Sequence, residues 1–222
     1  MVKVYVGRKR ELYIFPEALL VERFPFFNAA FQSGFRESTD KSIELAEDDP
    51  AAFSYVMNMA FGEGWKMSAK LEGVDAQLKP ANAYIVADKL GRPDVASSIS
   101  EDCQCLFYNE GSFDDYLVCG KAAKLVYENT TESAPIRTFM VEMAAHQYNH
   151  FQCFTYEEME KWSKTIRCHP KFHVAVMISI KQASLLRTRF RCNCNLPSCE
   201  VHTMRLLGHG GNGDGMESAF KR

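Results

Sequence analysis

Apolar and polar positions alternate near the start of the chain, and this alternation predicts a small sheet. The segment Val2–Val6 has valine at every second position, which is the pattern of a half-buried strand. A basic turn at 7–10 separates it from a second predicted strand at 11–15, so the two should form a hairpin. A third short strand is predicted at 42–45, where two apolar residues fall on the same side.

Helical spacing begins after Pro16, which suits the first turn of a helix because its missing N–H is not needed there. We predict one helix over 17–22 and a second from Pro25 to the break at Gly34. An aromatic set in and before the second helix is either a partner-binding groove or, the reading that we favour, mostly core with one or two exposed rings. Its members are Phe24, Phe26, Phe27 and Phe31.

Two carboxylates, Asp48 and Asp49, directly precede Pro50. They suggest an acid–base or metal pair, but their place ahead of a proline favours the capping of a helix. The predicted helix has an apolar stripe and ends at Gly62, and residues 65–79 after it are ambiguous in pattern and are predicted to be a loop with some local structure. The stripe consists of Phe53, Val56, Met57, Ala60 and Phe61.

The remaining chain is helical in pattern. Helices are predicted from Pro80 to Leu90, from Pro93 to about Asn109, and over Tyr156–Arg167. Apolar stripes predict three more, and their residues are Phe113, Tyr116, Leu117, Gly120, Ala123 and Tyr127, then Ile136, Phe139, Met140 and Met143, then Phe172, Val176, Ile180, Ala183 and Leu186. A boundary near residue 110 separates an α+β part from an all-α part.

Short motifs in the first half carry a family resemblance. In chain order they are Val2-Lys3-Val4-Tyr5-Val6-Gly7, Glu17-Ala18-Leu19-Leu20, Phe24-Pro25-Phe26-Phe27, Ala30-Phe31, Gly34-Phe35-Arg36-Glu37-Ser38, Ile43-Glu44-Leu45, Glu47-Asp48-Asp49-Pro50, Phe53 and Ala87-Asp88-Lys89-Leu90. Together they resemble the BTB/POZ domain, in detail its fungal branch, over roughly residues 2–100. The resemblance implies a helical cluster flanked by a small three-stranded sheet, used for protein–protein contact.

The expected organisation is therefore a BTB/POZ domain over 1–109, a helical extension over 110–191, and a Cys-rich turn with a flexible Gly-rich tail over 192–222. The resemblance implies a homodimer, pairing with another BTB protein, or an adaptor that brings a target to a cullin-type ubiquitin ligase. A dimerising scaffold or transcription-linked cofactor without a ligase role is the alternative. The helices around 47–61 would hold the contact residues, which are Glu47, Asp48, Phe53, Met57 and Phe61.

Composition narrows the function classes. The chain of 222 residues is 46% hydrophobic and 24% charged, as is usual for globular proteins, and its net charge is −2. We expect no direct nucleic-acid or membrane partner, and the basic run at 181–191 is interpreted as a solvated helix end. No apolar run approaches the ~18 residues of a membrane span, and no signal peptide is recognisable, so we expect an intracellular protein of cytoplasm or nucleus.

The last candidate chemistry is a cluster of thiols and an imidazole near the C-terminus, formed by Cys192, Cys194, Cys199 and His202. Zinc takes four such ligands, but the spacing matches no standard motif, so ordinary thiols are favoured, and a zinc site and redox chemistry stay open as alternatives. No cysteine stands in a recognisable nucleophile setting with His and Asn or Asp. We therefore predict a protein without enzyme activity and without a cofactor.

Overall fold

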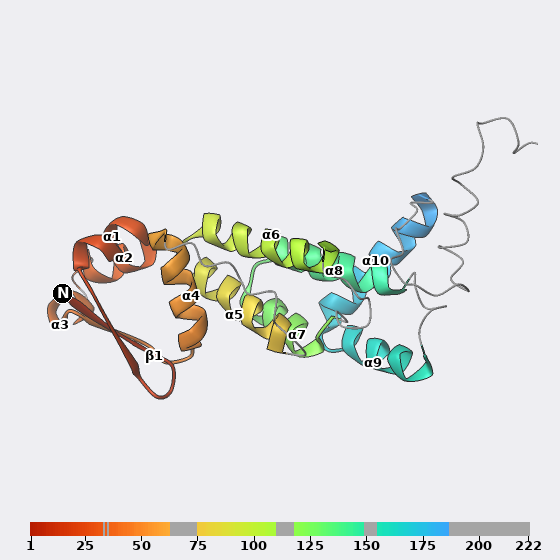
Figure 1. The fold of residues 1–222 in the computed structure, drawn as a ribbon, viewed down its shortest axis with the longest axis horizontal. Coiled ribbons are helices and arrows are strands. Elements are labelled where there is room, and N and C mark those ends of the chain that lie inside the picture. The colour runs from red at the N-terminus through yellow and green to blue at the C-terminus, as the bar shows by residue number, and fades with distance from the viewer. Residues whose placement is uncertain (33, 35, 63–74, 110–117, 149–154, 187–222) are drawn as a thin grey trace, which may run out of the picture.

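The computed structural model describes residues 1–32, 34, 36–62, 75–109, 118–148 and 155–186. Its elements are, in order, β1 (Val2–Val6), β2 (Glu11–Phe15), α1 (Glu17–Arg23), α2 (Pro25–Gln32), α3 (Arg36–Asp40), β3 (Ser42–Leu45), α4 (Pro50–Phe61), α5 (Asp75–Lys89), α6 (Pro93–Asn109), α7 (Gly120–Asn129), α8 (Pro135–Tyr148), α9 (Tyr156–Ile166) and α10 (Pro170–Leu186). The fold is elongated, with the sheet at one end and α9 and α10 at the other (Figure 1). The predicted α+β class with a small three-stranded sheet is confirmed.

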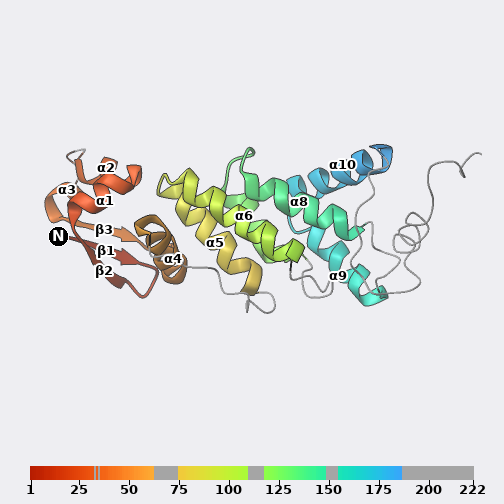
Figure 2. The ribbon, with the colours of Figure 1, turned by 45° about the horizontal axis from the view of Figure 1, so that its top comes forward.

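The sheet is mixed, with the strand order β2-β1-β3 (Figure 2). Strands β1 and β2 form the predicted antiparallel hairpin, in which Val4 lies opposite Tyr13, whereas β1 and β3 run parallel. The three valines of β1 are fully buried on one face, next to Ile43 and Leu45 of β3. Leu12 and Ile14 of β2 lie on the other face and are exposed. The alternation in the sequence therefore separates a core face from an open face, as a period of two requires.

Helix α4 begins and ends as the local sequence predicts. The Asp49 carboxylate accepts a hydrogen bond from the backbone N–H of Ala52 at 2.8 Å, which caps the helix just ahead of Pro50. At the other end Gly62 has a left-handed φ of 85°, and its N–H donates to the carbonyls of Asn58 and Met59. The capping role of Asp49 is confirmed.

Helix α5 begins earlier than predicted. It starts at Asp75, within the stretch that we expected to be a loop with some local structure, and Pro80 is its sixth residue instead of lying in its first turn. Residues 65–74 of that stretch lie outside the described residues. Proline costs a helix one backbone hydrogen bond and a steric clash, but the ring of Pro80 is buried here. Packing of α5 against α4 and α6 offsets that cost, because it covers the apolar residues that follow the proline.

The helical part continues the same core. Helix α5 contacts α7, α6 contacts α8, and α10 packs on α8. The predicted stripe of α8 is confirmed as buried, and so is the described part of the α10 stripe, Phe172, Val176 and Ile180. The helix predicted over 113–127 begins only at Gly120: residues 118 and 119 are not helical, and 113, 116 and 117 lie outside the described residues.

Candidate interaction surface

Two residues of the predicted contact set belong to the core, and this corrects the prediction. Phe53 is 0% exposed and Met57 is 4% exposed. Helix α4 lies between the sheet and α5, so both of its apolar flanks are covered (Figure 1). The ring of Phe53 meets Tyr13 edge-on at a centroid distance of 5.0 Å, and it meets Phe15 at 6.3 Å. These side chains hold the sheet to the helices and present no surface to a partner.

The other three residues of the predicted contact set have different surroundings. Asp48 forms an ion pair of 2.5 Å with Lys89 of α5, and its side chain is mostly buried, so it fastens the start of α4 to α5. Phe61 is half-buried against the core. Only Glu47 is exposed. The five predicted residues therefore do not form one contact surface.

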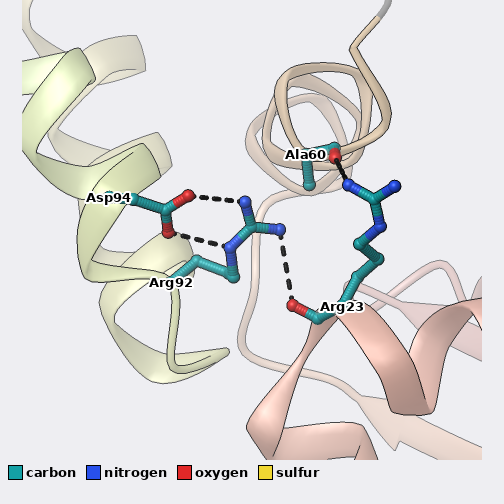
Figure 3. Close-up of polar contacts among 4 residues, drawn as sticks. All are labelled: Arg23, Ala60, Arg92 and Asp94. Atoms are coloured by element: carbon teal, nitrogen blue, oxygen red, sulfur yellow. Dashed lines mark hydrogen bonds and ion pairs between the residues drawn. The ribbon is translucent and has the colours of Figure 1, made fainter.

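A polar junction joins the ends of α1 and α4 to the start of α6 (Figure 3). The Arg92 guanidinium donates to both carboxylate oxygens of Asp94, at 2.8 and 2.6 Å, and to the carbonyl of Arg23 at 3.4 Å. Arg23 in turn donates to the carbonyl of Ala60 at 3.4 Å. The hydrogen bonds from Arg92 lower the pKa of Asp94 to about 2. Because these donors already have partners, the junction is a structural clamp.

An apolar groove with a volume of about 630 Å³ lies between α8 and α10. Its apolar lining comes from Val141 of α8 and from Val174, Ala175 and Ile178 of α10. Val174 and Ile178 are 58% and 51% exposed, which is unusual for side chains of this size. The apolar stripes in the sequence did not predict this groove, although a signal was present: Val174 and Ile178 are apolar residues outside the buried stripe of α10.

The polar end of the groove carries more positive than negative charge. Buried Arg137 donates from Nε to the Thr130 hydroxyl at 2.9 Å and from Nη2 to the Tyr127 carbonyl at 2.8 Å, which closes the C-terminal end of α7. Lys171 forms an exposed ion pair of 2.5 Å with Glu132, and its hydrogen bond lowers the pKa of that carboxyl. Arg137 forms no direct ion pair among the described residues, although its charge also lowers the pKa of Glu132. The polar end of the groove therefore holds two cations, Arg137 and Lys171, and one carboxylate, Glu132.

Two of the described thiols, Cys103 and Cys168, are not activated. Burial raises the pKa of Cys103 to about 12, and it also raises the pKa of Cys168. Both thiols are protonated at neutral pH and are therefore poor nucleophiles. Within the described ranges, no three His, Cys, Asp or Glu side chains come together as a metal site. Cys192, Cys194, Cys199 and His202 lie outside these ranges, so the zinc hypothesis stays a prediction.

The chain matches no protein-family model, and it matches neither the curated proteins nor the solved structures with which it was compared. None of the helices in the described ranges is both long and apolar enough to cross a membrane. A proposal for the function must therefore rest on the exposed surfaces of this chain and on the resemblance of its motifs.

Proposed function

We propose that this chain is a protein-interaction module built on a BTB/POZ-type N-terminal unit. It binds a second copy of itself or another BTB protein, or it brings a target to a cullin-type ubiquitin ligase. The observation that carries the proposal is the exposure of large apolar side chains at both ends of the elongated fold, Leu12 and Ile14 at one end and Val174 and Ile178 at the other. Exposed apolar residues that cluster on a surface mark protein–protein contact sites more often than singly scattered ones do.

The sheet end suits contact with a second copy. Strand β2 is an edge strand, and its exposed Leu12 and Ile14 lie next to Tyr5 and Lys3 of β1 in register. The amides of Lys3 and Gly7 donate to carbonyls on the β3 side, so by alternation the backbone groups of Val4 and Val6 face β2, where Val4 lies opposite Tyr13. By alternation, the backbone groups of Leu12 and Ile14 point away from β1. An edge of this kind is a template for a further strand.

Light scattering over a concentration series tests self-association. We expect a dimer that dissociates toward monomer at concentrations on the order of 1 µM, which is typical of a modest interface. The double variant Leu12→Glu/Ile14→Glu should stay monomeric with an unchanged circular-dichroism spectrum, because both side chains are exposed. Met177→Glu is the matched control, since Met177 is 47% exposed at the other end of the molecule.

Capture on the tagged full-length chain then separates the two forms of the proposal. Binding of a purified cullin supports the adaptor, and a dimer that binds no cullin supports the scaffold without a ligase role. A protein that is monomeric throughout the series and captures neither a cullin, nor an untagged copy, nor another BTB protein contradicts the proposal.

A further inference from the structure

We infer that the groove between α8 and α10 binds an amphipathic helix of a partner protein, and that this helix carries a carboxylate beside its apolar side chains. The inference rests on the proposed function, because it names the chemistry of a partner for one surface of the proposed interaction module. It concerns the helical end of the molecule and is independent of the sheet edge at the other end.

The shape of the groove suits a helix. Lys171, Val174 and Ile178 stand at positions i, i+3 and i+7 of α10 and so follow one side of it for two turns, or about 10 Å. Val141 of α8 faces them from the opposite wall. A helix that binds in such a groove contacts it with side chains at the same spacing. A small ligand is disfavoured, because its pocket normally encloses most of its surface, whereas Val174 and Ile178 are more than half exposed.

The charge at one end of the groove selects an acidic partner. Arg137 forms no direct ion pair among the described residues, and its charge acts only at longer range on Glu132, whose pKa it helps to lower. Its guanidinium lies 4.5 Å from the centre of the Tyr127 ring at the groove wall. The Lys171–Glu132 pair is exposed, and exposed pairs contribute little stability, so Lys171 can exchange Glu132 for a carboxylate of the partner. A carboxylate placed there complements the excess positive charge, and a basic side chain is repelled.

A second copy of this chain is a poorer occupant of the same groove. The one carboxylate among the described lining residues is Glu132, and it is already paired with Lys171. Two copies that met through this face would bring apolar walls together but would supply no additional carboxylate for Arg137 or Lys171. The observations therefore favour a different chain with an acidic, amphipathic helix.

Selection from a displayed library of helical 16-residue peptides, with the intact protein as bait, tests the inference. Peptides that also bind the double variant Val174→Glu/Ile178→Glu are removed during the selection. We expect the enriched peptides to carry apolar residues at i, i+3 or i+4, and i+7, with Asp or Glu on one flank. The selected peptide, labelled with a fluorophore, should lose at least about tenfold in affinity on the double variant, as for a central contact. Met177→Glu should bind normally, because Met177 is an exposed apolar residue of α10 outside the groove.

A charge exchange tests the acidic contact. Lys171→Glu should weaken binding several-fold, and changing the peptide carboxylate to lysine should restore affinity for this variant but not for the wild type. The inference is overturned by a failure to enrich any peptide, by enrichment of basic or uncharged peptides, or by equal binding to the double variant. The inference is also overturned if the wild type is a dimer and Val174→Glu/Ile178→Glu is a monomer, because a second copy of the chain then fills the groove. If the double variant still captures the partners of the wild type, the proposed function stands and this inference alone fails.

Discussion

Replacing Phe53 with alanine removes a ring from the contact between the sheet and α4. Phe53 is completely buried and touches the rings of Tyr13 and Phe15. We expect the substitution to destabilise the fold strongly, because the site is enclosed by a strand on one side and by helices on the other. If Phe53 were a contact residue, as the family resemblance implied, the same change would reduce binding and leave stability almost intact.

The magnitude follows from the burial. A buried aromatic side chain covers about 150–250 Å² of surface, and at about 25 cal/mol per Å² the part beyond Cβ contributes roughly 3 kcal/mol. Lost edge-to-face contacts and the cavity left behind bring the expected loss to about 3–5 kcal/mol. Phe61 is the matched control: it is on the same helix and in the same stripe, but it is only half-buried, so Phe61→Ala should cost about half as much.

Urea unfolding followed by circular dichroism measures both changes as a free energy of unfolding. Should Phe53→Ala fail to fold, Phe53→Leu gives the same test at a smaller loss, about 1–2 kcal/mol. A loss below about 1 kcal/mol for Phe53→Ala, or a loss no larger than that of Phe61→Ala, would refute the assignment of Phe53 to the core.

Three further changes test particular contacts. Asp49→Ala should lower the free energy of unfolding by about 1 kcal/mol through loss of the helix cap, while Asp49→Asn, measured in the same urea series, should retain most of it. Gly91→Ala should cost more than Gly62→Ala, because both have left-handed φ but only the Cβ added at Gly91 meets a proline, at 3.1 Å; equal losses would exclude a steric effect at that proline. Arg92 depresses the pKa of Asp94 to about 2. The stabilisation of the fold by the Arg92–Asp94 pair is therefore present above about pH 4 and is lost as the pH falls toward 2. Between about pH 4 and about pH 2 the free energy of unfolding should fall less in Asp94→Asn than in the wild type. The difference should be at most about 1 kcal/mol, because the carboxylate is largely exposed. Identical pH profiles of the two proteins would contradict the pairing.

Local sequence was sufficient where a few neighbouring residues determine the backbone. Strand β3 agrees with prediction because Ile43 and Leu45 alternate with polar residues over only four positions. The start of α4 follows from the carboxylate of Asp49 and from the proline after it. The helix ends at Gly62, because glycine adopts the left-handed φ of this position without strain. Each of these signals acts within one turn of the chain and needs no knowledge of the remaining fold.

Packing between distant segments determines the features that no local sequence pattern predicts. Helical spacing placed Phe53 and Met57 on one face, but only the position of α4 between the sheet and α5 shows that this face is covered. The start of α5 was missed because Pro80 resembles a first-turn proline, whereas burial of its ring stabilises a helix that extends before it. The groove unites Val141 with Val174, which are far apart in sequence, so no local pattern predicts it.

The most direct measurement of the central claim is quantitative capture from native extract on the tagged full-length chain, with each bound protein then purified and re-bound. The account predicts at least one protein, a second copy included, that binds the purified chain directly in about equimolar amount. It also predicts that this binding is lost when exposed apolar residues are changed at the sheet edge, by Leu12→Glu/Ile14→Glu, or in the groove, by Val174→Glu/Ile178→Glu. The absence of any direct equimolar partner would contradict a protein-interaction function for this chain. A direct partner whose binding neither double variant changes would contradict the assignment of the contact to these two surfaces.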